Sequence, residues 1–148
     1  MSRFDTIRWP KRLAIAALAF AACAVQAQIA PSAADATRYT GVLGAAHRGD
    51  VTKIEKLVAN KADVNAVDGY GRTPLHVATF AKQREAIRAL AKAGANLGAL
   101  ENDRYDAVTI ASVADDEETL RTLLALGASA KLTTSRYDGT ALIAAAHL

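Results

Sequence analysis

Four consecutive acidic residues, Asp115-Asp116-Glu117-Glu118, are the strongest candidate in this chain for a metal or catalytic site. Clustered carboxylates could hold a metal ion or transfer protons. The run also fits the start of a helix, where acids favour the positive end of the helix dipole. Asp115 and Glu118 have the spacing of a capping box, although aspartate replaces the usual serine or threonine. We therefore expect a helix start here, with a metal-dependent enzyme or small-ligand binder as the alternative.

The three histidines offer no catalytic set. Nothing is spaced to pair with His76 as a nucleophile or an orienting acid would be, and His47 and His147 lie far from any matching partner. No combination of His, Asp and Glu has the spacing of a metal site. No glycine-rich phosphate loop or nucleophile motif occurs. We expect no catalytic residue, no metal and no cofactor.

The elements that position these residues are indicated by a period of 33 residues. An acidic residue opens each of three blocks, and alanines and aliphatic residues recur at the same offsets in each. The positions in register are Asp35, Asp68 and Glu101; Ala45, Ala78 and Ala111; Ala62, Ala95 and Ala128; Ile54, Ile87 and Leu120; Leu57, Leu90 and Leu123. A fixed period of this length indicates stacked supersecondary units.

One phrase indicates the kind of unit. Thr73-Pro74-Leu75-His76, with Ala78 two residues later, resembles the Thr-Pro-Leu-His-x-Ala phrase of the ankyrin repeat family. The resemblance implies an all-α solenoid of helix-turn-helix units with β-hairpin-like loops. It implies a repeat domain over residues 40–148, with three full repeats at about 35–67, 68–100 and 101–134 and a partial fourth at 135–148. It also implies that His76 is structural and bonds to backbone near the turns.

Local signals in the second repeat support helical units. Thr73 is a suitable N-cap, and Pro74 fits the first turn of a helix that runs to about Ala81. Apolar residues at helical spacing predict a second helix over residues 84–92, which Gly94 would end. Such short helices are marginal alone, so neighbouring repeats must bury their apolar faces.

The third repeat departs most from the pattern. Asp106-Ala107-Val108-Thr109 stands where the second repeat has its threonine-proline phrase, and Arg104 replaces the turn glycine. We expect this repeat to be the least stable or the most specialised.

The amino-terminal residues 1–27 have the pattern of a secretory signal peptide. Four basic residues precede an uncharged apolar run of 13 residues, 13–25. This run is shorter than the roughly 20 residues of a membrane-spanning helix. Val25-Gln26-Ala27 supplies the small residues of a cleavage site, so we expect cleavage after Ala27 and a periplasmic or secreted protein. The alternative is a lipoprotein anchored at Cys23. Residues 28–39 are expected to be a short linker.

Charge and cysteine content limit the partners. The whole chain has 18 basic and 15 acidic residues, and the leader holds four bases and one acid, so the remainder has 14 of each. Bases and acids are interleaved there, and no basic face of the kind that binds nucleic acid is evident. The single cysteine, Cys23, lies in the leader, so stability must come from apolar stacking rather than disulfides.

What remains is a surface for a protein partner. The resemblance implies that the loop tips and the exposed side of the first helices form it, and each tip offers one tyrosine and one arginine, residue types enriched at binding hot spots. The candidate residues are Asp68, Tyr70, Arg72, Asn102, Asp103, Arg104, Tyr105, Arg136 and Tyr137, with Phe80 and Val113 on the first helices. Stacking of Tyr70 on Tyr105 to stiffen the tips is the alternative role. We expect a non-catalytic scaffold or inhibitor.

The chain stops within the first helix of the fourth block, at Leu148. Terminal repeats normally cover the core with a polar face. We expect either a fragment of a longer protein, or an open end that docks against a partner or a second copy.

Overall fold

A computed structural model of the chain describes residues 28–132 and residue 134. Within them the helices are α1 (Ala33–Arg38), α2 (Gly41–Arg48), α3 (Val51–Ala59), α4 (Pro74–Phe80), α5 (Arg84–Lys92), α6 (Ala107–Val113) and α7 (Glu117–Ala125). The leader 1–27 with Cys23, and the partial fourth repeat with its open end, lie outside the described residues. The predictions made for them stay predictions.

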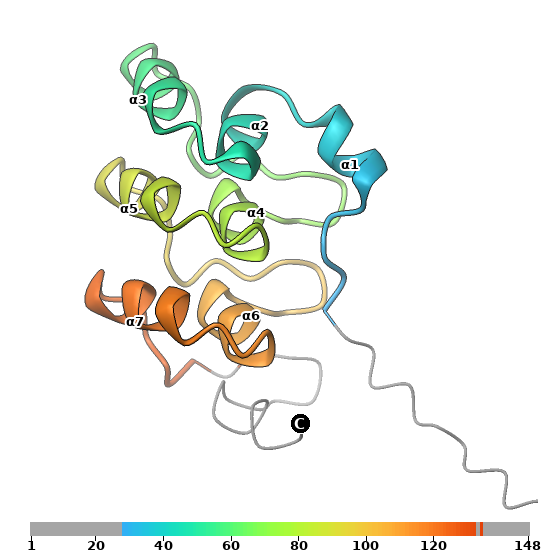
Figure 1. The fold of residues 1–148 in the computed structure, drawn as a ribbon, viewed down its shortest axis with the longest axis vertical. Coiled ribbons are helices and arrows are strands. Elements are labelled where there is room, and N and C mark those ends of the chain that lie inside the picture. The colour runs from blue at the N-terminus through green and yellow to red at the C-terminus, as the bar shows by residue number, and fades with distance from the viewer. Residues whose placement is uncertain (1–27, 133, 135–148) are drawn as a thin grey trace, which may run out of the picture.

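Helices α2 to α7 form a stack of three helix pairs. Each pair is in contact within itself, and along the stack α2 contacts α4, α4 contacts α6, α3 contacts α5 and α5 contacts α7. The first helices therefore form one row and the second helices another, and the long loops between pairs extend beyond the first row (Figure 1). The prediction of an all-α solenoid is confirmed. Among the described residues no helix has the length and apolar character needed to cross a membrane.

The second repeat follows its local signals closely. Thr73 is the N-cap of α4, its side chain accepts a hydrogen bond from the His76 N–H, and Pro74 occupies the first turn. Helix α5 spans the predicted residues, and Gly94 just beyond it has a left-handed φ of +90°. In the third repeat Asp106 takes the capping role of Thr73, and its carboxylate accepts from the Thr109 N–H at 2.7 Å.

The start of α7 corrects one prediction. Asp116, rather than Asp115, is the N-cap, and its carboxylate accepts hydrogen bonds from the backbone and the hydroxyl of Thr119. Asp115 has a φ of +50° and lies in the turn before the helix. The proposed box between Asp115 and Glu118 is therefore wrong, because the chain needs one left-handed residue before α7 can start.

Left-handed residues recur with the same period as the apolar positions. They lie at the turn inside each pair, after each second helix, and at the loop tips: Gly49, Lys82 and Asp115; Lys61, Gly94 and Gly127; Gly71 and Arg104. Left-handed backbone costs an ordinary residue roughly 1–2 kcal/mol, and glycine avoids that cost. At these positions the repeats follow the same backbone path whether or not glycine is present.

Lys61→Gly is therefore expected to raise the free energy of unfolding by about 1 kcal/mol, and Gly94→Ala to lower it by about 1 kcal/mol. A Cβ at Gly94 would meet no atom within 4 Å, so its cost would come from backbone conformation alone. Urea denaturation of both variants measures the two effects. Changes of the same sign would contradict the shared left-handed position.

The core is continuous through the stack. Ala45, Ala78 and Ala111 are fully buried at the first helices, together with Ile54 and Ile87 of the second row. These residues were predicted from the period alone. Alanine at the first helices allows the rows to approach closely, and the larger side chains fill the space between them.

Residues 28–39 correct another prediction, because they are more than a linker. Ser32 caps α1 with a full capping box to Asp35, and Tyr39 at the end of the segment is buried. Gly44 of α2 allows this approach, since a Cβ there would lie 2.5 Å from the Tyr39 carbonyl oxygen. The segment packs beside the loop tips (Figure 1).

Candidate partner-binding surface

Each described loop tip is a small hairpin organised by its opening acid. In the first tip, residues 68–72, the Asp68 N–H donates to the Arg72 carbonyl, and the Asp68 carboxylate accepts from the Tyr70 and Arg72 N–H groups. In the second tip, residues 101–105, the Glu101 carboxylate accepts from the Asp103 and Tyr105 N–H groups. The acidic residue that opens each of these two tips therefore holds the backbone of its own turn, a role that the period alone did not reveal.

The two tips are joined to one another. The Asn102 N–H donates to the Tyr70 carbonyl at 3.0 Å, and the Asn102 amide donates to the Gly69 carbonyl at 3.4 Å. These bonds hold the two tips side by side, so the side chains that project from them lie on one surface.

His76 connects α4 to the second tip. Its Nδ1 accepts from the Thr73 N–H at 3.0 Å, which leaves Nε2 to donate to the carbonyls of Ala99 and Tyr105, at 3.0 and 3.1 Å. This pattern requires the neutral ring protonated on Nε2. Burial lowers the pKa of His76, although the two carbonyls oppose it. The ring has the structural bonds that the resemblance implied.

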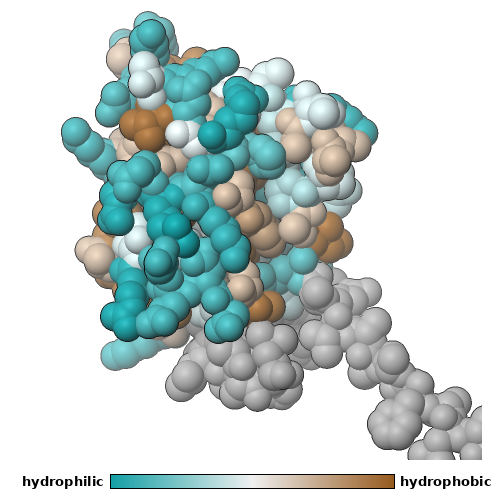
Figure 2. All heavy atoms as spheres, viewed as in Figure 1, coloured by the Kyte–Doolittle hydropathy of each residue, from teal (hydrophilic) through white to brown (hydrophobic). Residues whose placement is uncertain are grey.

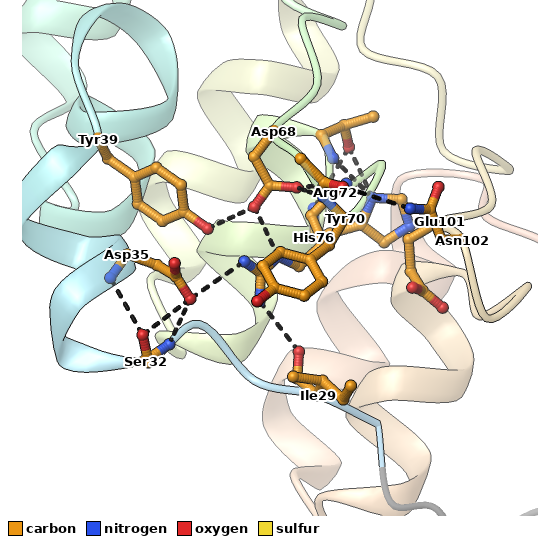
Figure 3. A network of polar contacts seen from close by, with 12 residues as sticks. Ile29, Ser32, Asp35, Tyr39, Asp68, Tyr70, Arg72, His76, Glu101 and Asn102 are labelled. Carbon is orange, nitrogen blue, oxygen red and sulfur yellow. Dashed lines mark hydrogen bonds and ion pairs between the residues drawn. The ribbon is translucent and has the colours of Figure 1, made fainter.

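The sequence analysis placed Arg72 and Asp68 on the exposed contact surface, and this prediction is wrong. Arg72 is only 1% exposed and its Nε donates to the Asp68 carboxylate at 2.6 Å, while the Tyr39 hydroxyl donates to the same carboxylate at 2.6 Å (Figure 3). Burial alone would raise the pKa of Asp68, but the bonds from Tyr39 and Arg72 lower it. The segment before α2 covers this pair, which the sequence pattern of the tips could not show.

The other candidates differ in exposure. Tyr70 is 44% exposed and its ring lies against the Arg72 guanidinium, whose Cζ is 4.3 Å from the ring centroid. Asn102 and Arg104 are exposed, with a φ of +66° at Arg104 where the first tip has Gly71. The remaining described candidates, Phe80, Asp103, Tyr105 and Val113, are half-buried. Arg136 and Tyr137 lie outside the described residues.

Two exposed apolar residues were missed. Val67 and Leu100 stand directly before the acids that open the tips, one period apart, and both are exposed. The repeated position was a signal that could have found them. Away from the tips, hydrophilic residues gather over α5 and α7, and apolar residues show over the first row in the middle of the same face (Figure 2).

A shallow hollow lies between the first tip and the segment before it. Its volume is about 340 Å³, and its lining includes Tyr39, Leu43 and Tyr70 together with Asp35 and Asp68. The segment and the tip are therefore incompletely packed against each other.

The acidic run has other partners than a metal. Arg84 pairs with Asp116 at 3.2 Å and with Glu118 at 2.9 Å, and Arg121 pairs with Glu117. Burial would raise the pKa of Asp116, but bonds from Thr119 and Arg84 lower it. Within residues 28–132 and at 134 no group of three or more His, Cys, Asp or Glu side chains could hold a metal ion. The carboxylates cap and brace α7.

Comparison with known proteins agrees with this architecture. A family model described as ankyrin repeats in three copies matches residues 13–101 and 42–135. The putative ankyrin repeat protein YahD of Escherichia coli (strain K12) is 30% identical over 80 residues, which cover 54% of this chain and 40% of that protein. The match thus spans less than half the length of this curated relative.

Proposed function

The chain belongs to the ankyrin repeat family, whose repeats are generally protein–protein interaction modules, and we propose that it binds a protein partner without catalysis. The partner contacts the tip surface, which we define as Val67, Tyr70, Leu100, Asn102 and Arg104. The observation that carries the proposal is the pairing of the two tips through the hydrogen bond from the Asn102 N–H to the Tyr70 carbonyl. Tips joined in this way lose less conformational freedom on binding than separate loops would.

The composition of the tip surface suits a protein interface. Tyrosine and arginine are enriched at hot spots, and an apolar centre with a polar rim is the usual arrangement. Val67 and Leu100 supply exposed apolar area, Tyr70 an exposed ring, and Asn102 and Arg104 polar groups. Phe80 and Val113, half-buried on the first row, extend this surface toward the helices.

We propose further that the protein is exported. The basic and apolar pattern of residues 1–27 supports a cleaved leader that ends at Ala27, and a periplasmic or secreted destination. A lipid anchor at Cys23 is the other form of the same proposal. In either place the repeats work as a scaffold for an envelope protein or as an inhibitor of one. An enzymatic partner that loses activity on binding would distinguish inhibition from scaffolding.

Affinity capture tests the tip surface. The double variant Tyr70→Ala and Asn102→Ala is expected to lose at least about tenfold in partner recovery, because truncating a hot spot costs about 2 kcal/mol or more. The readout is the partner recovered by the tagged protein from its own envelope fraction, quantified by mass spectrometry.

Leu124→Ala is the matched control. The exposed fraction of Leu124, 42%, is similar to that of Tyr70, but Leu124 lies on α7 in the second row. We expect it to capture the partner as the original chain does. Equal capture by the double variant, with its helical circular dichroism unchanged, would place the binding surface elsewhere.

A further inference from the structure

The segment that covers Arg72 is held by few contacts. We call residues 28–38 the strap, and it consists of an extended stretch followed by α1. Helix α1 has six residues and none of them is buried. Its capping box from Ser32 to Asp35 keeps the strap ordered within itself but does not attach it to the repeats. So short a helix with no buried face gains little from tertiary packing.

Two polar contacts join the strap to the first tip. The Ile29 carbonyl accepts from Arg72 Nη1 at 3.1 Å, and the Asp35 carboxylate lies 3.5 Å from Arg72 Nη2 (Figure 3). The second distance is long for a charge-assisted hydrogen bond, which is usually about 2.7–2.9 Å. A hollow of about 340 Å³ lies beside Asp35, between the strap and the first tip.

The guanidinium of Arg72 has two different edges. Its Nε is committed to Asp68 at 2.6 Å within the tip itself. Its Nη1 and Nη2 groups both point to the strap, where a carbonyl and a distant carboxylate share them. Such a pair of N–H groups matches one carboxylate, which forms two parallel bonds with arginine. The two hydrogen bonds that the strap accepts from this edge are longer than the pair that a single carboxylate would accept.

We propose that the Nη edge of Arg72 is a binding site for an aspartate or glutamate side chain of the protein partner, and that the strap occupies this site until the partner displaces it. This site rests on the proposed function, and it requires an acidic residue at the place where the partner meets Arg72. The exchange replaces Asp35 by another carboxylate, so the buried guanidinium keeps a counter-charge. Tyr39, bonded to Asp68, stays in place as the pivot.

The site is continuous with the tip surface. The ring of Tyr70 lies against the Arg72 guanidinium and is itself exposed, so an acidic residue bound at Arg72 lies next to a tip that the partner contacts. The partner can bind only when the strap is open. Its apparent affinity is therefore its intrinsic affinity multiplied by the fraction of molecules in which the strap is open. Weakening the strap therefore strengthens binding.

A peptide titration of the full chain tests this site. The probe is acetyl-Gly-Glu-Tyr-Glu-Gly-amide, and its neutral match has glutamine in place of both glutamates. Asp35→Asn removes the competing carboxylate and is expected to bind the acidic peptide at least about fivefold more tightly than the original chain. Glu55→Gln, an exposed acid on α3, makes the same change in net charge and is expected to have no effect.

Nuclear magnetic resonance locates the binding. The Arg72 Nε–H signal of the Asp35→Asn protein should shift with the acidic peptide and stay unchanged with the neutral one. Adding Arg72→Lys should abolish the enhancement, because lysine lacks the paired donors. Equal affinity of Asp35→Asn and the original chain, no binding by Asp35→Asn, or enhancement that persists with Arg72→Lys would overturn the proposal. None of these results would change partner capture by the tip surface, which is measured separately.

Discussion

Leu75→Ala is expected to lower the free energy of unfolding by about 2–5 kcal/mol, the range for a buried leucine truncated to alanine. Leu75 is 1% exposed on α4, the middle helix of the first row, which contacts both α2 and α6. A cavity there loosens the contacts of all three repeats. Urea denaturation followed by circular dichroism measures the change.

Leu124→Ala is again the matched control, with the same chemical change at an exposed position of α7. Its expected effect is below about 1 kcal/mol, as for surface substitutions in general. A change of under about 1 kcal/mol in Leu75→Ala would contradict the placement of Leu75 in the core.

His76→Ala is expected to cost about 3 kcal/mol or more. The change leaves the buried Thr73 N–H and the carbonyls of Ala99 and Tyr105 without the ring that bonds them, and each unsatisfied group costs about 1–3 kcal/mol. His47→Ala is the control, because His47 is half-buried and its ring lies 6.1 Å, centroid to centroid, from the ring of Tyr39. Comparable losses in the two variants would contradict the bridging role of His76.

The same residue gives a pH dependence. The pKa of His76 is lowered in the folded chain, so between that value and its ordinary value of 6.5 the unfolded chain binds a proton that the folded chain does not. Stability from His76 is therefore complete above pH 6.5 and declines as the pH falls below it. The decline just below pH 6.5 should be absent from His76→Ala.

Much of the scaffold could be predicted because the same residue types recur at the same positions of each repeat. The period placed Ala45, Ala78 and Ala111 together, and the capping threonine with its proline placed the start of α4. These signals are local or strictly periodic, so one sequence contains them. The departure of the third repeat at Arg104 also has a physical counterpart, since that residue adopts the left-handed backbone of a turn glycine.

The error at Arg72 comes from contacts between distant segments, and the other errors come from weak or ambiguous local signals. Arg72 was assigned to the exposed tip, because nothing in residues 68–72 shows that Ile29 and Asp35 lie over it. The helix in residues 28–39 was missed since six residues carry too weak a pattern, and Asp115 was taken for a cap because spacing alone does not reveal a left-handed turn. Exposed Val67 and Leu100 were missed, although they stand one period apart.

The most direct test of the account is site-specific photocrosslinking in the living cell. A benzophenone side chain placed at Tyr70, at Asn102 or, as the control, at Leu124 reports which surface touches another protein. We expect an adduct with the same protein from positions 70 and 102 and none with it from 124. Adducts from Leu124 alone, or no adduct from either tip, would contradict binding through the tip surface.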